Sequence, residues 1–394
     1  MYAQQTLKSH PLKLLMMILL FIAGNAAAQT SSDSTTTDST LLKQIEQDMQ
    51  SGNNQPVNPP VRSSLNFNPD LSLIGDFRAS YFSEGERNFD AYLNETEIGL
   101  QAVVDPYARA DFFLSFARNP ETHQYGVEVE EGYLTTLSLP ARLQLKVGKF
   151  KEALGRINPT HSHALPFIDM PNAFVNLFGE EGLNDEGVSL SWLLPNKAFY
   201  QEIIFQATAG FSETPSFSMS NGDHFIYLAH LKNFFTLSDN TTLELGLTGI
   251  NGPNDSSYTT TIAAADLTLK WKPVKLNTYH SFTWQSEFFN SHAYYSNKYA
   301  HNSWGMYSFL QYQIAKRWFL TGRFDYSEKP EDYPWPENYK IEEAAFSLTA
   351  GWYATEFQKI ELEAKTTDKN DATRFYQAWL RWIFVIGAHG AHQY

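Results

Sequence analysis

The chain has no cysteine among its 394 residues. This excludes disulfide bonds, thiolate metal sites, a cysteine nucleophile and a lipid-modified cysteine. Charged residues are also scarce, at 18% of the chain, where soluble domains typically have about 25%. The net charge of −14 argues against nucleic acid and against anionic membrane surfaces as partners.

Long hydrophobic runs are absent except near the N-terminus. There an apolar stretch from Leu14 to Ala23 follows Lys8 and Lys13, and small residues up to Ala28 offer a cleavage site. A membrane-spanning helix needs about 20 apolar residues, which is more than this stretch has. We therefore expect a signal peptide over residues 1–28, cleaved near Ala28, and no transmembrane helix in the mature chain.

The next segment, residues 29–63, is rich in Ser, Thr and Asp and then in Asn and Pro, which predicts a disordered periplasmic linker. Leu42, Ile45 and Met49 would share one face of a short helix inside it. A trimerising coil usually needs three or four heptads, so the pattern favours a fraying local helix. Residues 64–394 form the remaining domain.

What the chain has in excess is aromatic residues, 15% of the total, and short strand-like segments. About sixteen such segments follow Leu71. Short turns alternate with longer polar runs at 151–186, 212–223, 290–302 and 327–340. A lectin or propeller has no reason to place all its long loops at one end, whereas a transmembrane β-barrel does. We predict an all-β fold, an antiparallel transmembrane barrel of about sixteen strands.

Alternation along the strands supports an apolar outer face and a polar interior. In residues 107–117, Arg109, Asp111 and Ser115 oppose a run of apolar residues, with Phe113 as the exception. Glu128, Glu130 and Glu131 break the alternation, which predicts a β-bulge. The candidate pore-lining residues are of mixed charge and indicate little preference between cations and anions: Glu95, Glu97, Arg109, Asp111, Glu128, Glu130, Lys146, Arg323 and Arg381.

Two histidine pairs are weak candidates for zinc ligands. His161 and His163 lie in the longest loop, and His389 and His392 lie in the C-terminal tail. The sequence places no acidic ligand near either pair, and the two pairs fall on opposite sides of the membrane. We therefore expect loop packing and no cofactor. Ser162 lies in no Gly-x-Ser-x-Gly elbow, so no enzymatic activity is expected.

Residues 145–151, Leu-Lys-Val-Gly-Lys-Phe-Lys, followed by Leu154-Gly155-Arg156, resemble the strand end before the third loop of phosphate-selective porin O/P-like barrels. Residues 127–140, 142–186 and 386–394 resemble an uncharacterised family of porin-like outer-membrane proteins of Gram-negative bacteria. Some members carry the label zinc-regulated TonB-dependent receptor. This acidic chain lacks the basic ladder of phosphate-selective porins, and it is too short for a plug and 22 strands.

The resemblance implies a porin in the outer membrane of a Gram-negative bacterium that lets small hydrophilic solutes or ions diffuse passively. It also implies a third loop that folds inward and narrows the pore. The implied partners are outer-membrane lipid, lipopolysaccharide, the barrel-assembly machinery and two further copies in a homotrimer. Two alternatives are a substrate-specific or metal-linked uptake barrel, and a barrel that serves as an adhesin or structural anchor.

Overall fold

The computed structural model describes residues 69–84, 88–119, 122–211, 214–218, 225–274, 279–296, 299–329, 341–370 and 374–387. The chain divides into two units, residues 1–65 and 66–394, and all described residues belong to the second. The predicted signal peptide, the linker with its short helix, and the tail histidines His389 and His392 lie outside the described residues.

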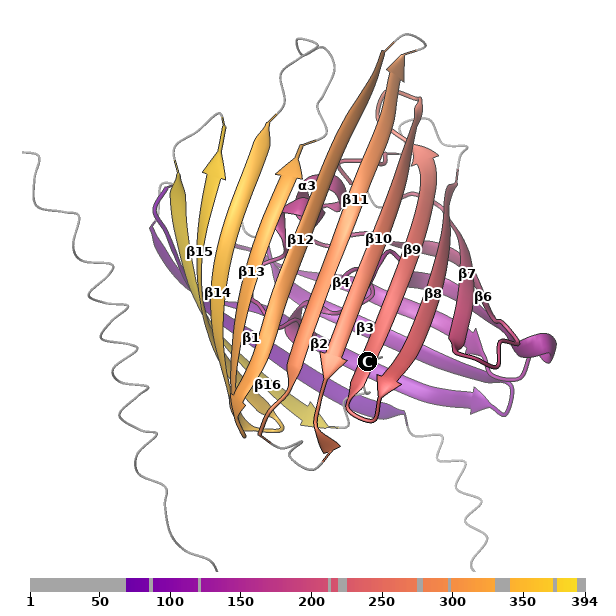
Figure 1. The fold of residues 1–394 in the computed structure, drawn as a ribbon, viewed down its shortest axis with the longest axis horizontal. Helices are drawn as coiled ribbons and strands as arrows, with labels where there is room; N and C mark the ends of the chain where they lie inside the picture. Colours follow the sequence, from indigo (N-terminus) through magenta and orange to yellow (C-terminus); the bar gives the residue numbers. More distant parts are fainter. Residues whose placement is uncertain are drawn as a thin grey trace, which may run out of the picture. The chain divides into compact units, whose positions relative to one another are not determined.

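Within the described ranges, sixteen antiparallel strands close into a barrel, because β1 pairs with β16 as well as with β2 (Figure 1). Closure leaves no unpaired sheet edge. The predicted sixteen-stranded barrel is confirmed. The strands are β1 Asp70–Phe82, β2 Phe89–Asp105, β3 Ala108–Arg118, β4 Tyr125–Thr136, β5 Leu143–Lys151, β6 Asn184–Leu193, β7 Tyr200–Thr208, β8 Ile226–Ser238, β9 Thr241–Pro253, β10 Thr259–Trp271, β11 Phe282–Ser296, β12 Tyr299–Ala315, β13 Trp318–Glu328, β14 Glu342–Thr355, β15 Gln358–Lys369 and β16 Phe375–Gly387.

Three short helices complete the described elements: η1 Pro140–Arg142, η2 Ser162–Ala164 and α3 Asn172–Phe178. None of these helices is long and apolar enough to cross a membrane. The first lies between β4 and β5. The other two belong to the connection between β5 and β6, residues 152–183, which we call the third loop.

The two ends of the barrel differ in their connections. Every predicted short turn joins an even-numbered strand to the next odd-numbered one, so all of them lie at the same end. The third loop starts from the opposite end. The predicted loop at 290–302 is wrong, because β11 and β12 continue through it as a hairpin. Its polar residues fit a strand, since Ser291 and Ser303 pair with each other and are buried.

Burial alternates along the strands as the sequence predicts. On β15, Lys359, Glu361 and Glu363 are buried, whereas the residues between them are half-exposed. On β16, Arg381 is fully buried between the exposed Leu380 and Trp382. The charged faces therefore point into the barrel and the apolar faces point out.

The predicted bulge lies in β4. Phe113 pairs with Glu131 and Leu114 pairs with Val129, so Glu130 is the extra residue. The bulge lets Glu130 and Glu131 approach the same side of the sheet, although they are neighbours in sequence. The unexpected inward Phe113 is buried and packs on His161 of the third loop, with ring centroids 5.2 Å apart.

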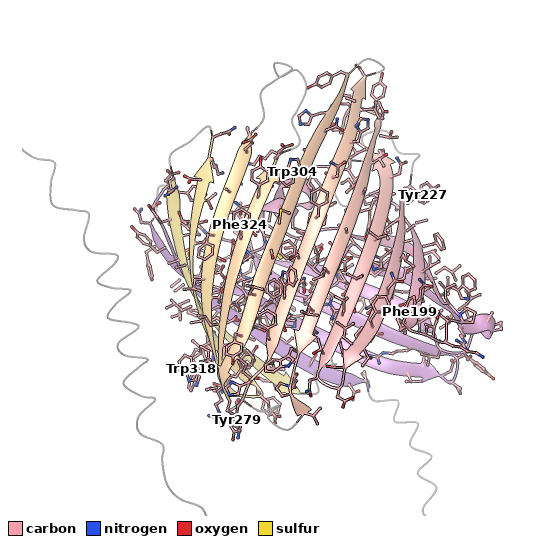
Figure 2. The ribbon with its side chains drawn as sticks, in the orientation of Figure 1. Phe199, Tyr227, Tyr279, Trp304, Trp318 and Phe324 are labelled. Carbon is pink, nitrogen blue, oxygen red and sulfur yellow. The ribbon has the colours of Figure 1, made fainter. Side chains whose placement is uncertain are left out.

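Labelled aromatic side chains lie toward both ends of the barrel, with Phe324 between them (Figure 2). Trp318 and Tyr279 lie toward the short-turn end in the view, and Trp304 and Tyr227 lie toward the other end. Trp304 packs on Tyr326 with ring centroids 4.5 Å apart. Two aromatic levels on an apolar exterior are typical of a barrel that spans a membrane.

Candidate functional site: the third loop inside the barrel

The third loop lies inside the barrel. Its first turns are held by β11, on another side of the barrel from β5, where the loop begins. The backbone amides of Arg156 and Ile157 donate to Glu287 Oε1 of β11 over 2.9 and 2.8 Å. Gly155 has a φ of 56°, and a Cβ there would lie 2.2 Å from Glu287 Oε2. Only glycine allows this conformation together with such a close approach. Residues about 130 positions apart in sequence are thereby joined across the interior.

The middle of the third loop rests on the inner face of β13–β16. This charged wall consists of buried, ionisable side chains: Arg323, Asp325, Lys359, Glu361, Glu363, Lys365 and Arg381. Arg381 donates to the carbonyl oxygens of Ser162 and Phe167 over 3.1 and 2.9 Å. It also forms an ion pair with Glu361. Such hydrogen bonds fix the path of a backbone that has no strand partner.

Asp169 is the acidic residue in the middle of the third loop, and it anchors this stretch to the charged wall. It accepts from Arg323 at 2.9 Å and from Lys365 at 2.5 Å. Burial opposes ionisation of this carboxyl, but the charges of Arg323 and Lys365 dominate and lower the pKa of Asp169 from its ordinary value. A buried carboxylate with two cationic partners is a directional anchor.

The last part of the loop, with α3, packs on β8–β12. This apolar wall consists of inward side chains that touch the loop's own apolar residues: Ile226, Leu228, Ile250, Ile262, Ala264, Phe289, Tyr307 and Phe309. Phe178 of α3 meets Phe289 edge to face, with ring centroids 5.5 Å apart. Asn176 of α3 also donates to Glu343 of β14 at 3.3 Å. The apolar content of the loop is therefore buried inside the barrel.

Asn158 closes the base of the third loop. Its side-chain amide donates to the carbonyl oxygens of Glu152 and Leu183, each over 2.8 Å, and accepts from the Leu183 amide over 2.8 Å. The two ends of the loop are thus held together where it leaves β5 and enters β6. The loop is a closed, packed unit rather than an open connection.

The histidine pair of the third loop meets a group of carboxylates on β2 and β4. His161 Nδ1 lies 3.0 Å from Glu97 Oε2, and His161 Nε2 lies 2.9 Å from Glu131 Oε1. His163 Nδ1 lies 3.5 Å from the same Glu97 oxygen. The prediction that no acidic side chain lies near these histidines is wrong. Sequence analysis missed it because the carboxylates are about 30 and 64 residues away and are brought close by barrel closure.

These contacts also set the charge of His161. Burial by itself lowers the pKa of the imidazole, but the hydrogen bonds with Glu130, Glu131 and Glu97 outweigh burial and raise the pKa of His161 well above its ordinary value. In the absence of any other cation, a proton on His161 balances part of the surrounding negative charge.

The nine candidate pore-lining residues lie in different surroundings. Arg323 and Arg381 are fully buried beneath the third loop, and Glu97 and Glu130 are buried against it. The others make these contacts: Glu95 with Ser115 at 2.6 Å, Arg109 with Asp111 at 2.7 Å, Glu128 with Lys149 at 3.0 Å, and Lys146 over the Tyr133 ring at 4.1 Å. Arg109 and Glu128 are the most open, with side chains 42% and 70% exposed. Passage of a solute along any of the nine stays a prediction.

Sequence analysis missed most of the charged wall. Lys359, Glu361, Glu363 and Lys365 alternate one by one with apolar residues, which is the pattern of a strand that faces lipid on one side and a polar interior on the other. That strict alternation was the available signal. The partners of these residues in the third loop lie about 195 positions away, so no local pattern indicates the contacts.

No protein-family model matches the chain. An uncharacterized protein from Aquifex aeolicus (strain VF5) is 27% identical over an alignment 396 positions long, which covers 83% of this chain and 80% of the relative. Similar solved structures are outer-membrane proteins. They include an anion-selective porin from Comamonas acidovorans (TM-score 0.56, 8% identity, 81% of this chain and 99% of that one). The outer membrane channel DcaP of Acinetobacter baumannii has a TM-score of 0.55, 12% identity and coverage of 81% and 98%.

A trimer form of OmpT from Vibrio cholerae is similar as well, with a TM-score of 0.54, 10% identity and coverage of 81% of this chain and 100% of that one. At such low identity these likenesses concern the fold alone. The fold of this chain is that of outer-membrane porins and channels.

Proposed function

We propose that this protein is an outer-membrane channel for passive diffusion of small hydrophilic solutes or ions, and that the third loop forms its constriction. One observation carries the proposal: the loop is anchored inside a closed barrel near the middle of several strands. Its partners include Glu287 in β11, Glu363 in β15 and Arg381 in β16. An inward loop at that level sets the width of any passage through the barrel.

Charges beside the loop indicate which solutes would pass. Arg109 pairs with Asp111 on one side of the interior, and Arg156 and Lys232 both contact Glu244 on another. Each of these places holds both signs in local ion pairs, so we expect an interior that favours small polar solutes over apolar ones, with little preference between cations and anions. Selectivity for phosphate, which the motif at 145–151 implies, stays a prediction.

Single-channel recording of the refolded protein in planar bilayers tests the proposal. We expect stepwise, ohmic conductance in simple salt, with small steps because the loop fills much of the interior. A barrel that inserts fully but never conducts would contradict it. Heat-dependent migration in a detergent gel serves as the control for folding, because a closed barrel resists unfolding by detergent without heat.

The second candidate function is a substrate-specific or metal-linked uptake barrel. The cluster of His161, His163 and carboxylates favours it, because these side chains converge at a buried point inside the barrel. A folded but silent barrel that conducts only after its ligand or an energy-supplying partner is added would support this alternative.

The location and assembly follow from the same proposal. The apolar exterior with two aromatic levels would face outer-membrane lipid and lipopolysaccharide after insertion by the barrel-assembly machinery. The signal peptide over residues 1–28 would direct export, and N-terminal sequencing of the mature protein should give Gln29. A homotrimer, as in the OmpT trimer form, is expected and is checked by its mass in mild detergent.

A further inference from the structure

The cluster that joins the third loop to β2 and β4 has the composition of a metal site. His161 and His163 come from the loop, Glu97 comes from β2, and Glu130 comes from β4. Glu97, His161 and His163 are all buried, and each offers a ligand atom within 4.8 Å of the other two. Imidazole nitrogen and carboxylate oxygen together suit zinc and its neighbours among the divalent transition metals.

The distances between the donor atoms agree with one shared ion. Ligands about 2.1 Å from a tetrahedral zinc ion lie about 3.4 Å from one another. Glu97 Oε2 lies 3.0 Å from His161 Nδ1 and 3.5 Å from His163 Nδ1. Glu130 Oε1 lies 3.4 Å from His161 Nδ1. Three donors from β2 and the third loop therefore converge on one point, and Glu130 lies beside His161.

The other nitrogen of His161 has the partner that metal-binding histidines usually have. Nε2 lies 2.9 Å from Glu131 Oε1, so a proton on Nε2 would be donated to that carboxylate, and the lone pair of Nδ1 would point toward Glu97 and a metal shared with it. A carboxylate behind a ligand histidine fixes the ring and makes it more basic. The β-bulge is what allows Glu130 and Glu131 to take these two different positions.

Buried carboxylate oxygens without hydrogen bonds are a second indication of a cation, independent of the donor distances. Glu97 Oε1 and Glu130 Oε2 are buried and accept no hydrogen bond among the described residues. The carboxyl groups of Glu95 and Glu181 also interact electrostatically with Glu130. Lys151, 3.2 Å from Glu130, is the lysine at the cluster. Buried carboxylates without partners are costly, and a divalent ion supplies the missing charge.

We propose that Glu97, His161 and His163 bind one divalent transition-metal ion, with Zn²⁺ as the best match, beside the carboxylate of Glu130, and that this ion links the third loop to the wall at β2. The link would hold the loop on the side opposite the apolar wall. A hydrogen-bonded network around a protonated His161 is the competing explanation, and it does not need His163.

Equilibrium dialysis of the full-length, detergent-solubilised protein against Zn²⁺, followed by elemental analysis, tests the site. His389 and His392 are replaced by Gln in every variant, so that the tail contributes no binding. We expect one zinc per chain in this background. His163→Gln should weaken binding at least tenfold, because it removes a ligand while the contacts of His161 with Glu97, Glu130 and Glu131 persist.

The matched control is His292→Gln, which removes a half-buried histidine of β11 that is hydrogen-bonded to Asn302 and should leave zinc binding unchanged. Glu131→Gln should weaken binding by about tenfold, the low end for loss of a carboxylate behind a ligand histidine. Zinc should also raise the thermal unfolding temperature of the background protein but not of His163→Gln, whereas Mg²⁺ should raise neither.

Two results would overturn the proposal. One is a background protein that is folded, as judged by heat-dependent gel migration, yet retains no zinc. The other is equal zinc binding by the background protein and by folded His163→Gln. Neither result depends on whether the barrel conducts, so failure of the metal site and failure of the proposed channel are distinguishable.

Discussion

The apolar wall and the charged wall hold the same loop by different forces. On the apolar wall, aromatic and aliphatic side chains such as Phe289 pack against α3. On the charged wall, Arg381 and Lys359 donate to loop carbonyl oxygens at defined distances. Apolar burial supplies free energy without direction. Hydrogen bonds and ion pairs supply direction, but their net contribution is reduced by the cost of removing charges from water.

This difference explains how a loop of low regularity keeps one path inside a barrel. A loop held only by apolar contacts could slide along the wall, because such contacts are non-directional. A loop held only by buried charges would be costly to form. The two walls lie on neighbouring strands. Packing on the apolar wall therefore stabilises the loop, while hydrogen bonds to the charged wall fix its position.

The largest effect should follow removal of Arg381. Arg381→Ala leaves Glu361 with Lys359 as its remaining cationic partner and removes the donor of buried carbonyl oxygens at Ser162 and Phe167. We expect a loss of about 3–5 kcal/mol in the free energy of unfolding and a noisier open channel. Urea unfolding in lipid vesicles and bilayer recording measure the two effects.

Two variants control this prediction. Arg374→Ala removes an exposed arginine paired with Asp368 at the end of β15 and should change neither property. The double variant Arg381→Met with Glu361→Leu should lose less stability than Arg381→Ala alone, because the carboxylate that Arg381 neutralises is removed as well, while Lys359 keeps its hydrogen bonds to the carbonyl oxygens of His163 and Leu165. A double variant as unstable as the single one would show that the carbonyl contacts, not the charge, dominate.

The apolar wall should respond to loss of volume. Phe289 is fully buried against Phe174 and Phe178. Phe289→Ala should cost about 3 kcal/mol of unfolding free energy through the cavity it leaves, whereas Phe289→Leu should cost less than about 1.5 kcal/mol. If Phe289→Ala unfolds at the urea concentration of the parent, the apolar wall does not hold the loop.

Gly155 allows the approach of the loop to β11 and should tolerate no side chain. Gly155→Ala combines a positive φ with a clash against Glu287, so we expect a loss of about 1–2 kcal/mol from the backbone conformation alone. Gly249→Ala is the control, because nothing lies within 4 Å of the added Cβ and its φ is ordinary. Equal stability of the two variants would contradict the role assigned to Gly155.

The last prediction concerns pH at the start of the loop. Burial raises the pKa of Glu152 from 4.5 to about 7, with a further rise from Asp185 and an opposing hydrogen bond from Thr208. Since the folded-state pKa is raised, the stabilisation is present below pH 4.5 and is lost as pH rises through about 7. Glu152→Gln should therefore flatten the fall in thermal unfolding temperature between pH 5 and pH 8. If the unfolding temperature of the variant falls as much as that of the parent, the pH dependence comes from another group.

Much of the fold could be predicted from the sequence. The alternation of charged and apolar residues and the position of the short turns predicted the strand number, the orientation of each face and the bulge at Glu130. These signals are local, because a strand shows its two faces within about ten residues. The false loop at 290–302 arose because polar residues that face a barrel interior look like loop residues.

The site was much harder to predict, because its contacts are not local. Sequence analysis placed His161 in the third loop but could not bring Glu97 or Glu131 to it, since that depends on strand register and on closure. Likewise the apolar residues of the loop indicated burial but not which wall would cover them. Contacts between a loop and ten or more strands follow from the whole barrel and from no single segment.

The conductance of a loop-deletion variant tests the central claim most directly. Residues 156–182 would be replaced by a short Gly-Ser linker, which leaves Asn184 and the β5–β6 pairing in place. If the third loop forms the constriction, single-channel conductance should rise several-fold over that of the parent, and larger neutral solutes should enter. A folded variant whose conductance equals that of the parent would contradict the account.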